Sequence, residues 1–183
     1  MSTIYLIRHG KTEVNLRKLY CGSTDLSLSD MGIAELKQMN YAIKNVRFIT
    51  SGMKRTEETL HILFGDVAFD IEPDFREIDF GIFEMHCYDE LKDRMDYQQW
   101  ITGDNESNIP PQGESGKQMK QRVLNAFSKI IDDQQDVAII THGGVIAAIM
   151  EEYFPSENKN LYQWQPKPGH GYVIEDGNYI PIP

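Results

Sequence analysis

The sequence predicts an α/β fold of three layers, with helices on both faces of a mostly parallel central sheet. Short apolar runs rich in β-branched residues alternate along the chain with segments whose apolar residues recur at helical spacing. Strands that alternate with helices pair in parallel, because each crossover returns the chain to the same end of the sheet. With 183 residues, 40% of them hydrophobic, the chain can bury one substantial core and is too short for two. We therefore expect a single domain over residues 1–183.

The first half of the chain is predicted to supply three strands and two helices. Residues 3–7 are apolar and β-branched, as expected of a buried strand. Ser29 is placed to cap the next helix, since a serine oxygen accepts from the unpaired N–H groups of a first turn. That helix is expected to present one apolar face, formed by Ile33, Leu36, Met39 and Ile43. The following segments predict a strand, a helix and a weaker strand, over residues 46–51, 53–64 and 67–73.

The second half begins with the longest predicted helix and then returns to strands. Ser115 with Gln118 three residues later has the pattern of a capping box. The apolar stripe of this helix would be Met119, Val123, Phe127 and Ile130. A continuous apolar run over residues 136–144 contains His142 near its end, and helical spacing resumes over 145–154. Residues 172–182 predict a hairpin that turns at Asp176 and Gly177 and closes one edge of the sheet.

Composition narrows the classes of partner and compartment. The net charge of −10 argues against a nucleic-acid or anionic-membrane partner, because such binding relies on clustered Lys and Arg. Cys21 and Cys87 show neither a CxxC pattern nor disulfide-type spacing, which favours a reducing compartment. The start of the chain lacks a basic region and a cleavage site, and no apolar run reaches membrane-spanning length. We expect a cytoplasmic protein, with monomer and homodimer both open.

Chemically active side chains follow three of the predicted strands. Arg8 and His9 come at the end of the first strand, residues 51–55 follow the second, and His142 follows the third. Ligands of open parallel sheets bind beyond the carboxyl ends of the strands, so we expect these residues to meet at one rim. With Arg55 they would form a cationic cluster suited to an anion. Nearby cations favour neutral imidazole, which can act as a nucleophile. For His9 taken alone, the alternative is a buried structural histidine.

Five short motifs, in this order, resemble those of the histidine phosphatase superfamily, also called the phosphoglycerate mutase-like superfamily. They are LIRHGKTEVN (6–15), TSGMKRTEETL (50–60), FREIDFGIFE (75–84), PPQGES (110–115) and THGG (141–144). The resemblance is specific, because several motifs match in order over nearly the whole chain. It implies a phosphoglycerate mutase-like fold.

The resemblance also implies a role for each matching residue. His9 would be the nucleophile that becomes phosphorylated, and Glu77 would donate a proton to the leaving group. Arg8, Arg55 and His142 would bind the phosphoryl oxygens. The substrate pocket would include Asn15, Ser23, Thr24 and Gly143. We expect no metal and no cofactor, because the sequence has no HExxH motif and no carboxylate cluster at ligand spacing.

Two positions depart from the family's pattern. Gly52 stands where the second motif usually has proline, and is expected to loosen the turn that aims Arg55. Met85 stands where a glycine is expected after Glu84, and is expected to reshape the pocket wall. Among the other histidines, His170 is the candidate to border the pocket. Selectivity is expected to come from two loops, around residues 16–24 and 84–109.

The sequence does not fix the substrate, so several functions remain open. Within the superfamily the chain resembles the alpha-ribazole phosphatase branch of cobalamin synthesis, so alpha-ribazole 5'-phosphate is the expected substrate. A broad-specificity sugar-phosphate or nucleotide phosphatase is one alternative, and a phosphoglycerate mutase is another, although the mutases carry extra segments that this chain is too short to hold. A module that binds or dephosphorylates phosphoprotein is a third, although the joint presence of His9, Arg55, Glu77 and His142 argues against a non-catalytic module. A serine hydrolase is rejected for want of a G-x-S-x-G elbow.

Overall fold

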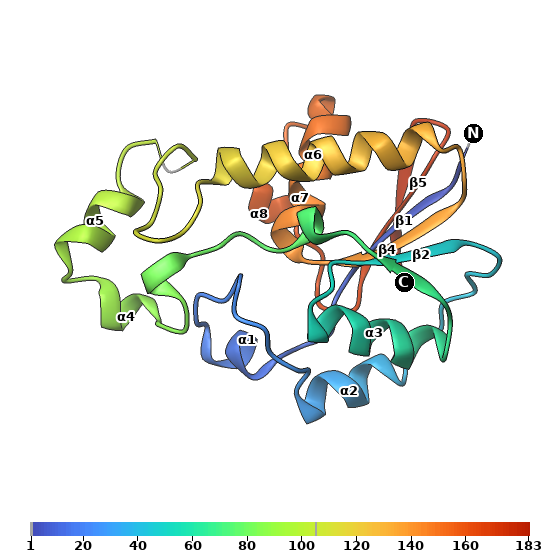
Figure 1. The fold of residues 1–183 in the computed structure, drawn as a ribbon, viewed down its shortest axis with the longest axis horizontal. Helices are drawn as coiled ribbons and strands as arrows, with labels where there is room; N and C mark the ends of the chain where they lie inside the picture. Colours follow the sequence, from blue (N-terminus) through green and yellow to red (C-terminus); the bar gives the residue numbers. More distant parts are fainter. Residues whose placement is uncertain (1, 105) are drawn as a thin grey trace.

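One six-stranded sheet forms the centre of the protein, seen in the computed structural model, which describes residues 2–104 and 106–183 (Figure 1). The strand order is β3-β2-β4-β1-β5-β6. Four strands pair in parallel: β3 (Phe69–Ile71), β2 (Arg47–Thr50), β4 (Val137–Thr141) and β1 (Ile4–Arg8). β5 (Gly171–Glu175) pairs antiparallel with β1, and β6 (Asn178–Ile182) pairs antiparallel with β5. The mostly parallel sheet that the sequence predicts is therefore confirmed.

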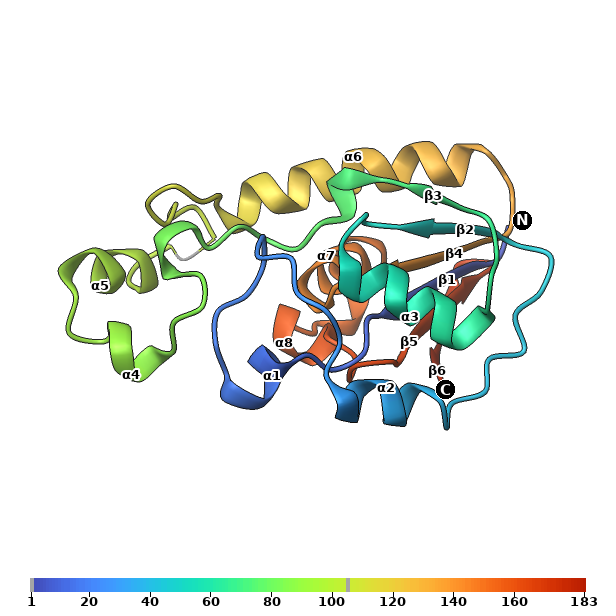
Figure 2. The same ribbon diagram turned by 60° about the horizontal axis from the view of Figure 1, so that its bottom comes forward.

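Helices cover both faces of the sheet (Figures 1 and 2). On one face lie α6 (Gly116–Asp132), α7 (Gly143–Tyr153) and α8 (Leu161–Trp164). On the other lies α3 (Lys54–Phe64), with α2 (Asp30–Leu36) beside it. β4 is buried along its whole length, with Val137 and Ile139 in the α6–α7 core and Ala138 and Ile140 in the α3 core. This alternation follows from the two-residue period of a strand, and it closes the sheet between two helical layers.

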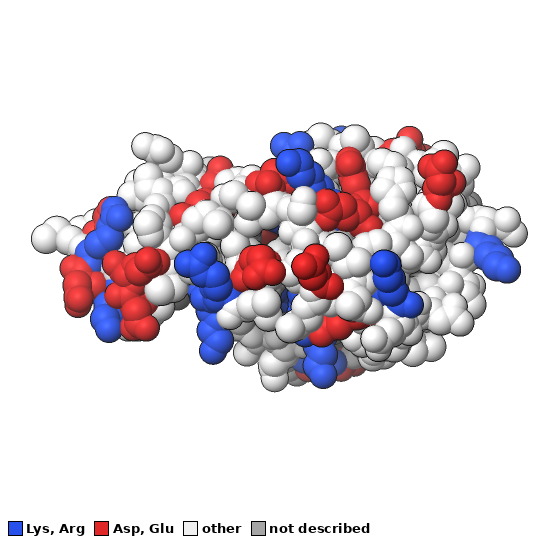
Figure 3. All heavy atoms as spheres, turned by 90° about the horizontal axis from the view of Figure 1, so that it is seen from below, with Lys and Arg blue, Asp and Glu red and all other residues white. Residues whose placement is uncertain are grey.

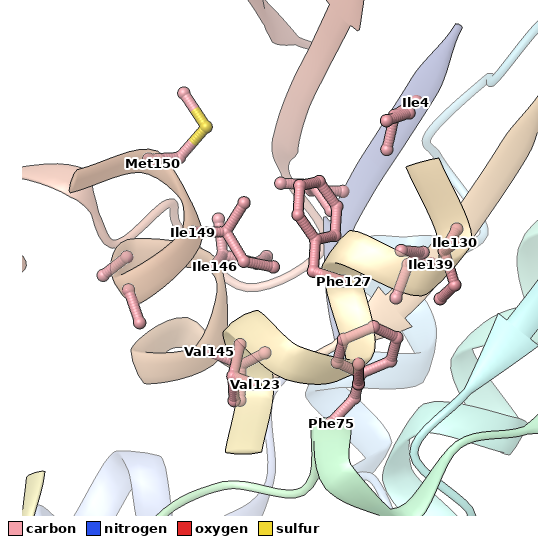
Figure 4. Packing of buried hydrophobic residues seen from close by; sticks show 14 of the residues in the cluster. Ile4, Phe75, Val123, Phe127, Ile130, Ile139, Val145, Ile146, Ile149 and Met150 are labelled. Carbon is pink, nitrogen blue, oxygen red and sulfur yellow. The ribbon is translucent and has the colours of Figure 1, made fainter. Parts of the chain in front are cut away.

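The predicted capping box and apolar stripe of α6 are both present. Ser115 Oγ accepts from the backbone N–H of Gln118 at 3.1 Å, and Gln118 Oε1 accepts from that of Ser115 at 2.8 Å. The side chains of α6 that are buried are Met119, Val123, Ala126, Phe127 and Ile130. Figure 4 shows Phe127 directed at the same interior as Val145 and Ile146 of α7. Interlocked apolar side chains of this kind supply most of the stability of a helix in a protein.

The C-terminal hairpin turns where the sequence predicts. Asp176 and Gly177 lie between β5 and β6 with φ of 50° and 73°. Positive φ at both central residues is the geometry of the two-residue turns that match the twist of a hairpin. β5 and β6 thereby extend the sheet beyond β1.

The predicted helix over 29–43 is wrong in its second half. Ser29 does cap α2, accepting from the N–H of Gly32 at 3.1 Å, but the helix ends at Leu36. Tyr41 then donates its hydroxyl to the carbonyl of Gly169 at 2.5 Å, and Ile43 packs with the α3-side core. Asparagine at position 40 is a poor helix former, so these tertiary contacts outweigh the apolar spacing.

Several short elements lie where the sequence showed no periodicity. These are α1 (Glu13–Arg17), α4 (Tyr88–Leu91), α5 (Met95–Ile101), the α8 already described, and the 3₁₀ turns η1 (Pro73–Phe75), η2 (Gly81–Phe83) and η3 (Pro155–Glu157). α4 and α5 project beyond the carboxyl ends of the parallel strands (Figure 2). They have an apolar cluster of their own, made by Tyr20, Phe80, Ile82, Phe83, Leu91, Tyr97, Trp100 and Ile101. We call these residues the cap cluster.

The surface carries mixed charge. On the face formed around α1, α2 and α3, Lys and Arg side chains are scattered among Asp and Glu (Figure 3). Both cysteines are free thiols. Among the described helices, none has both the length and the apolar character needed to cross a bilayer.

Met85 lies between η2 and α4, within the segment that forms the cap cluster, in a conformation that favours glycine. Its φ is 65°, and its N–H donates to the carbonyl of Tyr20 at 2.7 Å. A left-handed conformation costs an L-residue roughly 1–2 kcal/mol, because its Cβ crowds the backbone. This geometry explains why a glycine is expected here.

We predict that Met85→Gly is more stable than Met85→Ala by about 1 kcal/mol, since only glycine relieves the crowding at positive φ. Urea unfolding of the two variants measures the difference. Both lose the half-exposed methionine side chain, so the comparison isolates the backbone. Equal stabilities would show that position 85 carries no strain.

Candidate active site

The ends of three neighbouring strands bring the predicted cluster together. β1 pairs with β4 so that Arg8 is opposite Thr141, and β2 pairs with β4 so that Thr50 is opposite Ile140. The residues that follow these strands therefore meet, and the backbone N–H of His9 donates to the carbonyl of Thr141 at 2.9 Å. The His9 and His142 rings lie with centroids 5.2 Å apart at 64°. The rim that the sequence predicts is present, with Arg8 as the last residue of β1 itself.

His9 is held as a neutral imidazole with a defined tautomer. It is 5% exposed, and its Nδ1 lies 2.7 Å from the carbonyl oxygen of Gly10. A carbonyl only accepts, so Nδ1 carries the proton and Nε2 keeps its lone pair. Burial, with the charges of Arg55 and Arg8, holds the pKa of His9 well below its ordinary value of 6.5. These are the properties of an imidazole that can attack an electrophile through Nε2.

His142 is fully buried at the N-terminus of α7. Its Nε2 lies 2.9 Å from Ser51 Oγ, and its Nδ1 accepts from Arg55 Nε at 3.3 Å. Burial is the main cause that holds the pKa of His142 well below 6.5, followed by the charge of Arg55. The second histidine is thus also neutral in the absence of an anion.

Two guanidiniums lie beside these rings. Arg8 donates from Nη1 to the carbonyl of Pro166 at 2.8 Å, and its buried Nε has no hydrogen-bond partner among the described residues. Arg55 is 2% exposed and donates from Nη1 to the carbonyl of Thr24 at 2.8 Å and from Nη2 to that of Gly22 at 2.7 Å. Burial lowers the pKa of both, but arginine stays cationic in proteins. The cluster therefore concentrates positive charge where an anion can bind.

Glu77 reaches the same site and is held by backbone donors. Its Oε2 accepts from the N–H of Gly144 at 2.9 Å, and its Oε1 accepts from that of Ile78 at 3.0 Å. A Cβ at Gly144 would lie 2.4 Å from Glu77 Oε1, so glycine is needed for this approach. A Cβ at Gly143 would lie 3.0 Å from Arg8 Cζ. The two glycines of the THGG motif therefore make room for the site's carboxylate and guanidinium.

Arg122 fixes the backbone that carries Glu77, a role that the sequence did not reveal. Its guanidinium donates to the carbonyls of Asp74 and Arg76, both at 2.7 Å, and of Glu77 at 3.1 Å. The same guanidinium pairs with Glu114 through Nη2 and Nε. The glutamate of the PPQGES motif thus orients the arginine that holds the Glu77 segment.

Glu84 anchors the loop that contains two predicted substrate residues. Its carboxylate accepts from the backbone N–H groups of Gly22, Ser23 and Thr24 at 2.9, 3.0 and 3.3 Å. The hydroxyl of Thr24 donates to Glu84 at 2.7 Å, and that of Ser23 donates to Asp79 at 2.9 Å. Both hydroxyls are therefore engaged within the protein. The loop lies between this carboxylate and Arg55, which binds its carbonyls.

The structure places three further residues that the sequence singles out, Asn15, Gly52 and His170. Asn15 is exposed, and its Oδ1 accepts from the N–H and the hydroxyl of Thr12, both at 2.9 Å, so it caps α1. Gly52 has φ of 75°, which proline cannot adopt, so the turn between β2 and α3 differs from one built on proline, and its loosening stays a prediction. His170 lies in the segment that covers Arg8, since its carbonyl accepts from the N–H of Arg8 at 2.9 Å. Within the described residues, no three or more His, Cys, Asp or Glu side chains are grouped to hold a metal ion.

The fold and the site define a class: an α/β protein with a buried, cationic anion site at its strand ends and a neutral imidazole inside it. The chain belongs to the histidine phosphatase superfamily (branch 1), whose sequence profile matches residues 4–178. The family that the motifs predict is therefore confirmed.

Individual relatives agree with this assignment. The chain is 27% identical over 181 residues to the adenosylcobalamin/alpha-ribazole phosphatase of Salmonella typhimurium, covering 94% of this chain and 89% of the relative. It is 28% identical over 159 residues to a probable phosphoglycerate mutase of Cronobacter sakazakii, covering 82% and 74%. The structure of a putative alpha-ribazole-5'-P phosphatase from Escherichia coli matches with a TM-score of 0.85 at 23% identity, covering 98% and 94%. A phosphoglycerate mutase from Thermus thermophilus matches with a TM-score of 0.74 at 23% identity, covering 98% or more of both chains. These structural likenesses confirm the phosphoglycerate mutase-like fold.

The neutral histidines predict how stability depends on pH. In the unfolded chain both protonate near the ordinary pKa of 6.5, whereas in the folded protein both stay neutral well below it. The unfolded state therefore binds more protons below pH 6.5, and stability falls as the pH falls, by about 1.4 kcal/mol per pH unit for each histidine. We expect urea unfolding in phosphate-free buffer at about pH 7.5 and about pH 5.5 to show this loss, and His9→Gln to reduce it. An unchanged slope in His9→Gln would contradict the neutral form of His9.

Proposed function

We propose that this protein is a phosphomonoesterase that hydrolyses a small-molecule phosphate ester through a phosphohistidine intermediate. The observation that carries the proposal is the tautomer of His9, because the Gly10 carbonyl accepts a hydrogen bond from Nδ1–H and the Nε2 lone pair stays free among cations. Phosphoryl transfer depends chiefly on positioning and charge stabilisation. The buried guanidinium of Arg55, the partly buried one of Arg8, and His142 supply both.

In the first step, His9 Nε2 attacks phosphorus while the bond from phosphorus to the ester oxygen breaks. Arg8, Arg55 and His142 bind the phosphoryl oxygens, and Glu77 gives its proton to the departing alkoxide. The Gly10 carbonyl stabilises the Nδ1–H of the phosphorylated ring through its hydrogen bond. In the second step, water attacks phosphorus, Glu77 takes its proton, and the phosphorus–nitrogen bond breaks to release inorganic phosphate and His9.

The expected substrate is alpha-ribazole 5'-phosphate. Support comes from the relative in Salmonella typhimurium, whose name states an alpha-ribazole phosphatase, and which this chain matches over 89% of its length. The cap cluster stands beyond the strand ends, where it can meet the non-phosphate part of a substrate. A phosphoglycerate mutase is the second candidate, because other relatives carry that name.

The proposal extends to the protein's setting and to the remaining residues. We propose that residues 1–183 act as one domain in the cytoplasm, without a nucleic-acid partner, as a monomer or homodimer. Asn15, Ser23, Thr24 and Gly143 would border the substrate. Contact with a ligand requires Asn15 or the two hydroxyls to leave the partners they have in the unliganded protein.

The covalent intermediate is tested by trapping. We expect His9→Ala to abolish turnover, because the Nδ1 lone pair of His142 already accepts from Arg55 and does not replace the free Nε2 lone pair of His9. Wild-type protein, stopped during turnover without acid, should carry an acid-labile phosphate on His9. The variant His9→Gln, which keeps a polar side chain of similar size, serves as a folded control whose thermal unfolding stays near that of the wild type. A phosphate on serine, or none at all, would contradict the mechanism.

The role of Glu77 is tested by the leaving group. An alkoxide needs a proton as it departs and a nitrophenolate does not, so Glu77→Gln should lose about 10²–10⁴-fold on an alkyl phosphate but far less in the single-turnover burst with p-nitrophenyl phosphate. Gly144→Ala should show the same selective loss, because its Cβ would displace the carboxylate. Gly116→Ala is the matched control at another helix start, where a Cβ would meet only ordinary contacts at 3.5 Å. Equal losses on both substrates would make Glu77 a positioning group.

The substrate is tested by ranking phosphate esters by kcat/KM. We expect alpha-ribazole 5'-phosphate to exceed sugar phosphates and nucleotides, and 3-phosphoglycerate to be hydrolysed without conversion to the 2-phosphate isomer. Nuclear magnetic resonance of phosphorus distinguishes hydrolysis from isomerisation. Efficient interconversion of the two phosphoglycerates would favour the mutase.

A further inference from the structure

A continuous hydrogen-bond chain runs from Arg55 through His142 to the Met53 carbonyl, and its members beyond His142, Ser51 and Thr56, take no part in the proposed reaction. Arg55 Nε lies 3.3 Å from His142 Nδ1, and His142 Nε2 lies 2.9 Å from Ser51 Oγ. Ser51 Oγ lies 3.2 Å from Thr56 Oγ1, which lies 2.7 Å from the carbonyl oxygen of Met53. The four side chains that form this hydrogen-bond chain are at most 2% exposed, so their polar atoms depend on one another for partners.

The two ends of this chain fix the direction of every hydrogen bond in it. The Nε–H of Arg55 can only donate, so His142 Nδ1 accepts and carries no proton. At the other end the Met53 carbonyl can only accept, so the Thr56 hydroxyl donates to it. Thr56 Oγ1 then accepts from the Ser51 hydroxyl, and Ser51 Oγ accepts from the Nε2–H of His142. One hydrogen is present for each of the four bonds, and none is left over.

We propose that Ser51 and Thr56 are positioning residues that hold His142 as the neutral Nε2–H tautomer, with its Nδ1 lone pair on the side of Arg55. The opposite tautomer would set an Nδ1–H against the Nε–H of Arg55. It would also require Ser51 to donate to Nε2, leaving Thr56 Oγ1 without the hydroxyl hydrogen that it now accepts. A buried polar group that loses its partner costs about 1–3 kcal/mol, so the chain selects one tautomer.

The local fold explains how the sequence builds this chain. Ser51 directly follows β2 and His142 directly follows β4, and the parallel pairing of these strands places the two residues side by side. Gly52, at φ of 75°, then turns the backbone so that α3 begins with the Met53 carbonyl within reach of Thr56. A single segment, residues 51–56, thus supplies both hydrogen-bond partners that the His142 ring has among the described residues.

The tautomer is a property of the unliganded protein and can be measured without any substrate. Full-length protein with ¹⁵N-labelled histidine shows each ring nitrogen in a long-range ¹H–¹⁵N spectrum, and the spectrum of His142→Gln identifies the His142 signals among the five histidines. We expect a protonated nitrogen at Nε2 and an unprotonated one at Nδ1. A protonated Nδ1 in the wild type would overturn the proposal.

Two substitutions of Thr56 separate the hydroxyl from the shape of the side chain. Thr56→Val removes the hydroxyl, so the Ser51 hydroxyl loses its acceptor and can turn to His142 Nε2, and we expect the Nε2–H signal to shift towards the other tautomer. Thr56→Ser keeps the hydroxyl and should retain the wild-type spectrum. If Thr56→Val does not fold, Ser51→Ala is the second route, and the wild-type spectrum still decides. Folded Thr56→Val with an unchanged spectrum would overturn the role of Thr56.

The kinetic consequence rests on the proposed function, because it assumes that His142 binds the phosphoryl group. With Nε2–H held by Ser51, the ring can donate to a phosphoryl oxygen only after Nδ1 gains a proton as the anion binds. For Thr56→Val we expect kcat/KM with p-nitrophenyl phosphate to fall about tenfold, the scale of one hydrogen bond, with recovery in Thr56→Ser. The two failures are distinguishable. An inactive wild type with the Nε2–H tautomer would overturn the phosphatase and leave the positioning intact, whereas an active enzyme with Nδ1–H would do the reverse.

Discussion

The burial of Arg55 and two histidines beside the partly buried Arg8, at one end of the sheet, is the constraint on which the rest of the structure depends. Positive charge removed from water is costly unless hydrogen-bond acceptors or an anion compensate it. The protein supplies backbone carbonyls to both guanidiniums and keeps both imidazoles neutral. Neutral rings limit the repulsion within the cluster, and a phosphoryl group would bring the negative charge that balances it.

The surroundings of the site follow from this constraint. Arg55 donates to two carbonyls of the loop over 22–24, so that loop must be held in place. The Glu84 carboxylate holds it by accepting hydrogen bonds from its three backbone N–H groups. Glu77 must approach the N-terminus of α7 closely, which requires glycine at Gly144 and a fixed backbone behind the carboxylate. The Glu114–Arg122 pair supplies that backbone support. Motif residues that never face the cluster thus act by positioning those that do.

Much of the fold was predictable, because period and capping are local properties. The strands before Arg8, Ser51 and His142 were expected from apolar runs, and α6 from its capping box and stripe. The predicted helix over 29–43 is longer than α2, since the contact of Tyr41 with the distant Gly169 holds the second half of this range in another conformation. The sequence does not predict α4 and α5, because both helices are short and are stabilised by the aromatic packing of the cap cluster with Tyr20.

The sequence by itself determined the family, the order of the strands and of the longer helices α2, α3, α6 and α7, and the candidates His9, Arg55 and His142, because residue type, spacing and capping carry that information. Only the tertiary structure decided which nitrogen of each ring is protonated, since that depends on the Gly10 carbonyl for His9 and on Arg55 and Ser51 for His142. It also decided that Glu84 anchors a loop while Glu77 reaches the α7 terminus. Two glutamates seven residues apart look alike in a sequence, and only the hydrogen-bond donors that surround each of them determine its role.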